Sequence, residues 1–377
     1  MIVLSWVLGM LLAGSLIYCV LILVATHRYL SVPAPPDGET PPISLLKPMC
    51  GDEEGLEENL HSFFEQDYPA FEILFAVHRS DDTAVAVVEK VQREYAGRVE
   101  SRLIVTGESP VPNAKAYSLQ RLVAEARHEL LVMSDSDVRV SRGLFRQLAR
   151  EVAGARVGLV TCPYRSVAPA SVWSKMEAIG MNTEFLGGVF VSRMLEKMKF
   201  ALGPAIAMRR GILEAIGGFA YLREFLAEDF VLGNRTAQLG YEVVLSSEVV
   251  EHRIGKQSMV ENLSHRLRWA RSTRRSRPVG YWGQIFTYPL PLAILFCAVQ
   301  PGAWPIALLT LVLRVSAAWA TANSVLHDPL MRKQWWLLPL QDVLGFLVWI
   351  GGFQGKKIVW RDRECTLLAD GRLQVNS

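Results

Sequence analysis

The sequence predicts an α/β protein, with a globular middle built on a mostly parallel sheet and apolar membrane segments at both ends. Three observations favour this class. Half of the 377 residues are hydrophobic, and the ends are apolar while the middle carries most of the charge. In the middle, short apolar runs alternate with helical patterns, which is typical of βαβ units. The first 26 residues contain no charged side chain.

Residues 1–26 are expected to form an N-terminal transmembrane anchor, because they are long enough to cross a hydrocarbon core of about 30 Å. A cleaved signal peptide is disfavoured, since the positive charge of Arg28 follows the apolar run instead of preceding it. That flank also predicts that the chain continues on the cytoplasmic side. Residues 27–42 contain the Pro-rich stretch SVPAPPDGETPP and are expected to form a semi-rigid linker.

The globular middle is expected over residues 43–283. Apolar runs predict strands at 43–46, 71–77 and 102–106 and a central strand from Leu130, and helical spacing predicts helices at 56–66, 84–95 and 120–127. No GxGxxG or Walker sequence supports a dinucleotide cofactor or ATP. The net charge of +3 is too small to indicate a nucleic acid partner. Five scattered cysteines without C-x-x-C spacing argue against a zinc site or a disulfide framework.

The central strand leads directly into two carboxylates, Asp135 and Asp137, in the stretch LLVMSDSD. Side chains alternate along a strand, so the two aspartates would point to the same side and repel each other without a cation between them. Hard oxygen ligands suit Mg²⁺ or Mn²⁺. The stretch therefore predicts a metal site for a substrate diphosphate, with ordinary capping of a strand-to-loop turn as the alternative.

Other polar groups follow neighbouring strands and are expected at the same edge of the sheet. Asp81-Asp82 comes after the second strand and Pro112-Asn113-Ala114-Lys115 after the third. Asp82 could equally be the N-cap of the helix at 84–95, and Lys115 an ordinary surface lysine. Further along, Glu228 and Asp229 lie among apolar residues, which indicates either a solvated helix face or a carboxylate with a raised pKa and a chemical role.

A dense arginine run, HRLRWARSTRRSRP at residues 265–278, precedes the C-terminal apolar region. It is either a positively charged flank of a membrane segment or a guanidinium clamp for a diphosphate, and different arginines could serve each role. Residues 171–200 are rich in Trp, Met, Phe and Leu. This composition fits either interfacial helices bordering a lipid or plain core packing.

Residues 284–353 are expected to form a C-terminal membrane region with candidate segments at 284–300, 305–326 and 335–353. The third contains Asp342, whose charge must face protein or water, so this segment is expected to be re-entrant or interfacial. Two spans and one such segment would leave the tail, residues 354–377, in the cytoplasm.

Taken in order, these stretches resemble the inverting glycosyltransferases of families 2 and 21, most closely the ceramide glucosyltransferases. The matching pieces are LLKPMCGDEEGLEENLHSFFEQDYPAFEILFAV, Asp81-Asp82, PNAKAYSL, SDSDVRV, LGPAIAMRRGILEAIGGF, LAEDFVLG, HRLRWARSTR and VWRDR. The resemblance covers nearly the whole chain. It implies a GT-A fold, a UDP-sugar donor, Mg²⁺ or Mn²⁺, and a membrane lipid alcohol such as ceramide as acceptor.

By position, the resemblance implies roles for individual residues. Asp82 would lie at the nucleotide base, Asp135 and Asp137 would bind the metal, Asp229 would be the catalytic base, and Arg268 with Trp269 would hold the diphosphate and acceptor region. His265 stands where the family usually has Gln or Arg. Histidine can still donate to phosphate, but its charge depends on pH.

The expected function is therefore transfer of a sugar, with glucose as the first choice, from a UDP-sugar to ceramide at the cytoplasmic face of a membrane, with Lys115 and Asp135 also contacting the donor. Hopanoid-pathway glycosyltransferases look similar over the same motifs, so N-acetylglucosamine transfer to a triterpenoid alcohol is the main rival. The sequence also leaves open a processive polysaccharide synthase and a membrane-anchored nucleotide-binding scaffold.

Overall fold

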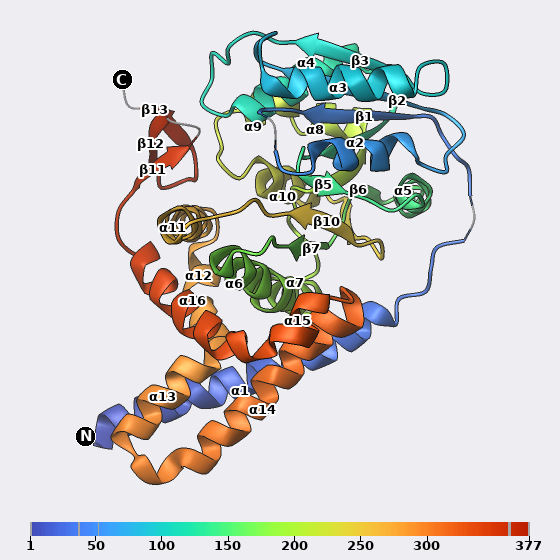
Figure 1. Ribbon diagram of the computed structural model, residues 1–377. Helices are drawn as coiled ribbons and strands as arrows, with labels where there is room; N and C mark the ends of the chain where they lie inside the picture. Colours follow the sequence, from blue (N-terminus) through green and yellow to red (C-terminus); the bar gives the residue numbers. More distant parts are fainter. Residues whose placement is uncertain (1, 37, 52, 361–362, 376–377) are drawn as a thin grey trace. The chain divides into compact units, whose positions relative to one another are not determined.

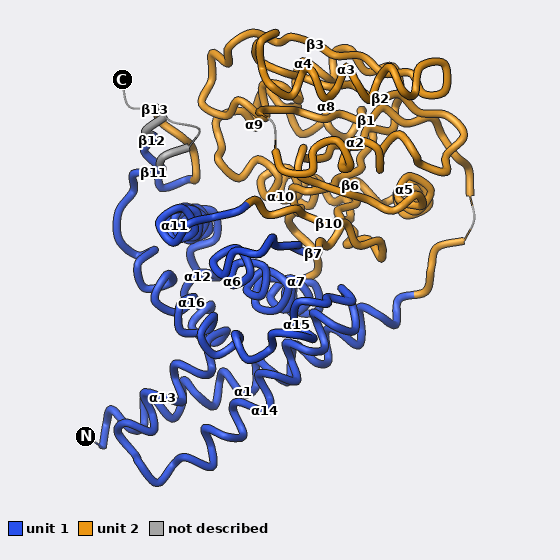
Figure 2. Tube along the Cα trace, in the orientation of Figure 1, with its two compact units in different colours: residues 1–32, 165–196, 256–370 blue, residues 33–164, 197–255, 371–377 orange. Residues whose placement is uncertain are grey.

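The computed structural model describes residues 2–36, 38–51, 53–360 and 363–375, which form two compact units (Figure 2). Unit 1 comprises Met1–Val32, Arg165–Glu196 and Lys256–Asp370, and unit 2 comprises Pro33–Tyr164, Lys197–Gly255 and Gly371–Ser377. The units are interleaved in the sequence. The contiguous middle expected at 43–283 is thus divided, because part of it groups with the apolar helices of the two ends.

Unit 2 is built on a seven-stranded sheet of order β3-β2-β1-β4-β8-β6-β9, of which β1, β2, β3 and β6 are labelled in Figure 1. The strands are β1 (Ile43–Pro48), β2 (Phe71–Val77), β3 (Glu100–Val105), β4 (Leu130–Ser134), β6 (Val157–Thr161), β8 (Ala205–Arg209) and β9 (Glu242–Leu245). β1 pairs in parallel with β2 and β4, β2 with β3, and β6 with β9, while β8 runs antiparallel to both of its neighbours. The prediction of a mostly parallel sheet is confirmed.

The apolar runs form the central strands of this sheet because both of its faces are covered. Every residue of β1 and β4 is buried, as is all of β2 except Phe71. Strands buried on both faces read as continuous apolar runs, which is the pattern in the sequence. Right-handed crossovers place α2 (Leu56–Phe64) and α3 (Thr83–Glu94) on one face and α4 (Ala114–Glu125) on the other. In agreement, α2 packs on α3, and α4 packs on β1 and β2.

Helix α4 begins earlier than the helix expected at 120–127. The side-chain oxygen of Asn113 accepts a hydrogen bond from the backbone N–H of Ala116 at 2.9 Å, so Asn113 is the N-cap. The polar group after β3 is therefore a helix start, and Lys115 lies in the first turn of α4 instead of in a loop.

Unit 2 also contains shorter strands and helices outside this sheet. They are β5 (Val138–Arg139), α5 (Leu144–Val152), α8 (Arg210–Ala215), α9 (Gly218–Leu222), α10 (Glu228–Gln238), β10 (Val250–Arg253) and β13 (Leu373–Val375). β5 and β10 form a short antiparallel pair, with His252 opposite Val138. β7 (Tyr164–Val167) lies where the chain leaves unit 2 for unit 1.

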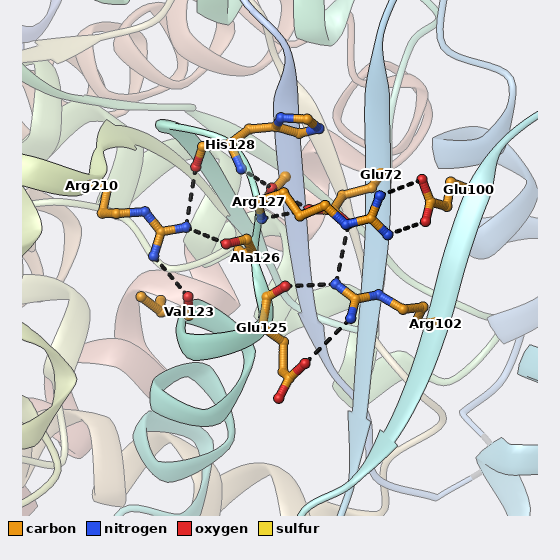
Figure 3. Close-up of polar contacts among 10 residues, drawn as sticks. Glu72, Glu100, Arg102, Val123, Glu125, Ala126, Arg127, His128 and Arg210 are labelled. Carbon is orange, nitrogen blue, oxygen red and sulfur yellow. Dashed lines mark hydrogen bonds and ion pairs between the residues drawn. The ribbon is translucent and has the colours of Figure 1, made fainter.

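The buried carboxylate of Glu72 connects the first residues of several neighbouring strands (Figure 3). This edge of the sheet is opposite to the edge at which β1 and β4 end. Glu72 at the start of β2 has a side chain only 2% exposed. It accepts hydrogen bonds from the Ser44 hydroxyl at 2.7 Å and from the backbone N–H of Arg127 at 2.8 Å, and the guanidinium of Arg102 lies 3.4 Å away. Arg127 also pairs with Glu100 on β3. These bonds offset the cost of burying the charge and join β1, β2, β3 and the segment before β4.

Unit 1 contains three helices that are long and apolar enough to cross a membrane among its described residues. They are Ile2–Leu30, Pro301–Val325 and Pro329–Gly352. The first is α1, the second contains α14 (Trp304–Trp319), and the third contains α15 (Pro329–Gln334) and α16 (Leu338–Gly352). The unit also holds α6 (Val172–Gly180), the π-helical turn η1 (Met181–Phe185), α7 (Leu186–Glu196), α11 (Met259–Ser276), β11 (Lys357–Trp360) and β12 (Arg363–Leu367). Arg361 and Asp362 of the terminal VWRDR motif lie outside the described residues.

The helices of unit 1 differ from the expected segments in two places. The segment expected at 284–300 is not one straight helix: α12 (Pro278–Gly283) with the turn to Thr287 is bent by 63° against α13 (Pro289–Val299). The segment expected to be re-entrant or interfacial at 335–353 belongs to a 24-residue helix, Pro329–Gly352, that is long enough to span. Which of these helices cross a bilayer stays a prediction.

Asp342 on α16 faces protein, as its burial requires. Its carboxylate, which is fully buried, takes two hydrogen bonds from the guanidinium of Arg314 on α14, at 2.7 and 2.8 Å. Arg314 also donates to the hydroxyl of Thr183 in η1 at 3.3 Å. The charge that suggested an interfacial segment is therefore neutralised inside the unit by a partner that the sequence pattern did not identify.

Replacement of Glu72 tests the polar junction at the strand starts. Glu72→Leu would leave the hydroxyl of Ser44 and the backbone N–H of Arg127 without this acceptor, so we expect a loss of about 1–3 kcal/mol in the free energy of unfolding. Glu72→Gln keeps an acceptor oxygen and should lose less. Thermal melting of the purified protein measures both, and exposed Glu89→Leu is the control. Equal melting temperatures for Glu72→Leu and the control would contradict this role.

Candidate active site

The turn after β4 carries Asp135 and Asp137, and the buried side chain of Lys47 holds its backbone in place. β4 ends at Ser134, so Asp135 and Asp137 lie beyond the strand, and the expected alternation of side chains does not apply to them. Lys47, fully buried at the end of β1, donates a hydrogen bond from Nζ to the backbone oxygen of Asp135 at 2.7 Å, and its ammonium lies 3.9 Å from the ring centroid of Phe63. Burial lowers the pKa of Lys47 to about 7, although the neighbouring aspartates oppose the shift.

Lys115 joins the two acidic pairs predicted from the sequence. Its Nζ lies 2.6 Å from Oδ1 of Asp135 and 3.0 Å from Oε1 of Glu228. Burial works to lower the pKa of Lys115, but the surrounding carboxylates raise it above its usual range, so the ammonium stays charged. The interpretation of Lys115 as an ordinary surface lysine is wrong.

Asp137 faces a different set of neighbours from Asp135. Its Oδ2 lies 3.1 Å from Nε2 of His252 on β10, and its Oδ1 is buried without a hydrogen-bond partner among the described residues. Burial disfavours the charged form, but His252 and the nearby lysines hold the pKa of Asp137 below its usual value. The carboxyl of Glu53 lies in the same region, and burial together with the charge of Asp137 raises its pKa to about 7. A buried carboxylate oxygen lacking a donor, beside further oxygen and imidazole groups, fits a divalent cation.

The second acidic pair begins helix α10. Both oxygens of Glu228 are engaged, Oε1 by Lys115 and Oε2 by the side-chain amide of Asn113 at 2.9 Å. In Asp229, Oδ1 accepts from the backbone N–H of Phe230 at 2.7 Å, while Oδ2 takes no hydrogen bond from the described residues. Burial and the charge of Glu228 raise the pKa of Asp229 to about 6. Of the two neighbours, Asp229 is thus the one with an oxygen available to a substrate.

Close backbone approaches at two glycines, Gly203 and Gly233, allow Asp229 and Asp135 to lie near each other. A Cβ on Gly203 would lie 3.0 Å from Oδ2 of Asp229 and 3.6 Å from Oδ2 of Asp135, so both carboxylates face this backbone. A Cβ on Gly233 in α10 would lie 2.3 Å from the backbone nitrogen of Ala201, so only glycine lets the helix approach that segment. The resulting pocket is lined by Pro48, Lys115, Leu119, Met133, Ser134, Asp135, Gly203, Ile206, Phe219, Glu228, Asp229 and Leu232.

Asp82 is the N-cap of α3, which is one of the two roles that its place in the sequence allows. Its Oδ1 accepts from the backbone N–H groups of Ala84 and Gly51, both at 2.9 Å. These bonds tie the loop after β1 to the start of α3. A contact of Asp82 with a nucleotide base remains a prediction.

His265, Arg268 and Trp269 lie on α11 of unit 1. Nδ1 of His265 is 3.0 Å from the buried carboxylate of Glu177 on α6, and its ring packs edge-on against Trp269 with centroids 5.3 Å apart. Arg268 makes no hydrogen bond to the described residues, and burial lowers the pKa of its guanidinium. These three residues are therefore close together on one helix.

Other arginines of the run have structural partners. Arg271 donates to the backbone oxygens of Gln354 and Lys357, each at 3.0 Å, and Arg274 donates to that of Gly355 at 2.9 Å. They satisfy carbonyls beyond the end of α16. These contacts explain Arg271 and Arg274 without either of the two roles left open for the arginine run, a membrane flank or a diphosphate clamp. Arg268, in contrast, is available for a ligand.

Several residues of the site were not found from the sequence. Lys47 and Gly203 lie inside the matching motifs, but nothing local marks their contacts. Asn113 was expected at this edge of the sheet together with Lys115, but its hydrogen bond to Glu228 was not predicted. His252 and Glu177 carry no local signal at all, because each reaches its partner only through the fold: His252 meets Asp137 across 115 positions, and Glu177 meets His265 from another helix.

The chain belongs to glycosyl transferase family 21, whose model matches residues 7–373. It is 27% identical over 240 residues to ceramide glucosyltransferase 3 of Caenorhabditis elegans, covering 62% of this chain and 51% of the relative. It is 30% identical over 141 residues to a ceramide glucosyltransferase of Komagataella phaffii, covering 33% and 27%. The chain spans about half the length of the first of these relatives.

The fold is similar to that of the mannosyltransferase PcManGT from Pyrobaculum calidifontis, solved in complex with GDP-Man and Mn²⁺. The TM-score is 0.55 at 19% identity, covering 92% of this chain and 99% of that chain. The predicted GT-A fold is confirmed, and so is the glycosyltransferase family.

A methyl group added at Gly203 should disturb Asp229. In Gly203→Ala the new methyl would press on Oδ2 of Asp229, and we expect turnover to fall about tenfold, equivalent to about 1.4 kcal/mol in the activation barrier. The melting temperature should change little, since the methyl meets side-chain oxygens of the pocket and not the backbone. Gly38→Ala, where a methyl meets nothing within 4 Å, is the control. Full activity of Gly203→Ala would show that the position of Asp229 is not critical.

Proposed function

We propose that this chain is a membrane-bound inverting glycosyltransferase that moves a sugar, glucose in the first place, from a UDP-sugar to the hydroxyl of a membrane lipid such as ceramide. The family assignment and the names of the relatives support a sugar transferase acting on a lipid. The proposal depends mainly on one observation, the difference in hydrogen bonding between the adjacent carboxylates of Glu228 and Asp229. Lys115 and Asn113 bind the two oxygens of Glu228. Asp229 lies beside Asp135, and one of its oxygens takes no hydrogen bond from the described residues.

Asp229 is the general base in this proposal. Its free Oδ2 takes the proton from the acceptor hydroxyl while that oxygen attacks the anomeric carbon of the donor. The bond between the anomeric carbon and the phosphate oxygen breaks on the opposite face, and UDP leaves with the electron pair. One displacement inverts the configuration. A carboxylate whose pKa is raised to about 6 is a stronger base than an ordinary aspartate and is still ionised at neutral pH.

Asp135 and Asp137 would hold Mg²⁺ or Mn²⁺, with His252 in reach of the same ion. Such an ion supplies Lewis-acid stabilisation to the departing diphosphate. The ammonium of Lys115 adds a fixed positive charge beside Asp135 and holds the carboxylate of Glu228 in place. We assign Lys115 to donor binding for this reason.

Arg268 and Trp269, with His265, are proposed to contact the donor diphosphate and the acceptor region. Arg268 has no hydrogen bond to the described residues to give up, and a guanidinium binds phosphate oxygens with two parallel bonds. Asp82 is proposed to contact the nucleotide base through the loop that it holds. The lipid acceptor would reach Asp229 from the membrane, and positive charge after α1 favours a cytoplasmic catalytic unit.

The decisive test compares the two adjacent carboxylates. Asp229→Asn keeps the shape of the side chain but cannot take a proton, so we expect kcat to fall on the order of 10² to 10⁴ while UDP-glucose still binds. Glu228→Gln keeps an acceptor for Asn113 and should lose less. UDP release with ceramide in vesicles gives the rates. If Glu228→Gln is inactive and Asp229→Asn is active, the base is assigned to the wrong residue.

The metal is tested by binding as well as by rate. We expect the wild-type protein to bind Mn²⁺ in titration calorimetry, and Asp137→Asn to bind at least about tenfold more weakly because one unit of ligand charge is removed. Chelator should abolish UDP release, and added Mn²⁺ or Mg²⁺ should restore it. Equal Mn²⁺ affinity of wild type and Asp137→Asn would remove Asp137 from the site.

Product analysis distinguishes ceramide glucosylation from the rival functions. Mass spectrometry of lipids from cells that express the chain should show hexosylceramide. A glycosylated triterpenoid would favour a hopanoid acceptor, long glycan chains a processive synthase, and no sugar product a nucleotide-binding scaffold.

A further inference from the structure

The segment that leads into the acidic pair of α10 is held on two sides by backbone hydrogen bonds. The carbonyls of Arg223 and Phe225 accept from Asn113, from its backbone N–H at 3.0 Å and from its side-chain amide at 2.8 Å. The carbonyl between them, that of Glu224, accepts from the backbone N–H of Leu373 at 2.7 Å. Successive carbonyls therefore alternate between Asn113 and the C-terminal end of the chain.

Residues 371–375 make further contacts with this segment, all within unit 2. Arg372 forms an isolated antiparallel bridge with Phe225. Its guanidinium lies 3.2 Å from the carboxylate of Glu224 and 5.6 Å from the ring centroid of Phe225. The side chains of Leu373 and Phe225 are buried, at 5% and 7% exposure. We name residues 371–375 the C-terminal strap.

Apart from the side-chain contacts of Glu228 with Lys115 and Asn113, helix α10 starts without a side-chain cap. Its N-cap is Ala227, whose side chain cannot accept a hydrogen bond from the first turn. Glu228 and Asp229 are its first two residues, so their backbone follows directly from the position of residues 223–227. A shift of this short segment would move Asp229 relative to Asp135.

From these contacts we propose that the C-terminal strap positions the general base. Leu373 holds one side of the segment 223–227 through its backbone hydrogen bond, and Asn113 holds the other side. This inference rests on the proposed function for the role of Asp229. Leu373 does not touch substrate in this proposal and acts through the placement of Asp229. A displacement of about 1 Å at a reacting group can cost about 10²-fold in rate.

Within the strap, the backbone bond and the buried leucine matter more than the ion pair. Arg372 and Glu224 are 45% and 51% exposed, and an exposed pair of this kind contributes about 0–1 kcal/mol. The hydrogen bond of Leu373 is protected by buried side chains, and removal of its N–H would leave the Glu224 carbonyl without that partner. Leu373 is therefore the residue to change.

The experiment uses the full chain in detergent or vesicles. Leu373→Pro removes the N–H donor, Leu373→Met keeps both the donor and the apolar volume, and Gln374→Ala changes a neighbouring exposed side chain. We expect Leu373→Pro to lower kcat by about 10- to 100-fold with the KM for UDP-glucose unchanged. Leu373→Met and Gln374→Ala should match wild type. Introduced into Asp229→Asn, Leu373→Pro should lower the residual kcat no further.

Hydrogen exchange provides a readout that does not depend on activity. In Leu373→Pro the amides of residues 223–232 should exchange faster, while those of β1 and β4 keep their protection. Wild-type kcat for Leu373→Pro, or unchanged exchange at 223–232, would overturn the strap. If Leu373→Pro instead lowers kcat equally in the wild-type and Asp229→Asn backgrounds, the strap does not act through Asp229, and the proposal also fails. If the wild-type chain releases no UDP, the proposed function is contradicted. The hydrogen-exchange result tests the role of the strap independently of that outcome.

Discussion

The site depends on one ammonium group, that of Lys115. It bridges the turn after β4 and the start of α10, two parts of unit 2 separated by more than ninety positions in the sequence. Asp135, Glu228 and Asp229 would otherwise repel one another inside a partly buried pocket. By binding Asp135 and Glu228 at once, Lys115 allows three carboxylates to stay close together, and it leaves the third with an oxygen that none of the described protein groups hydrogen-bonds.

The charge of Lys115 is useful only because the backbone around it is held rigidly. Asn113 caps α4, and this fixes the first turn that carries Lys115. The same side chain binds Glu228 and the segment before it. Lys47 fixes the Asp135 backbone from beneath. The polar groups of the site thus come from the first turns of two helices and the ends of two strands, a common way for α/β sheets to build a binding edge.

Much of the fold could be predicted, because strands buried on both faces are readable as apolar runs. The runs at 71–77 and from Leu130 became β2 and β4, and Asp135 and Asp229 were singled out from local pattern and resemblance. The start of α4 was misplaced because its cap, Asn113, follows a proline and precedes a weakly periodic stretch. The contacts of His252, Glu177 and Arg314 could not be read locally, since each partner comes from a distant element. The boundary between the units was equally invisible, because composition does not show that residues 165–196 pack with the terminal helices.

The ion pair between Arg314 and Asp342 has a consequence for how the protein is made. Each residue alone in a hydrocarbon environment would cost roughly 2.5–3.5 kcal/mol at the centre of a helix, by the scale derived from translocon insertion. The two lie 28 positions apart, on the consecutive apolar helices Pro301–Val325 and Pro329–Gly352, so neither helix carries its own neutralising partner. For helices that cross a bilayer, insertion of both as one hairpin therefore costs less free energy than insertion of each helix alone, because the paired charges neutralise each other.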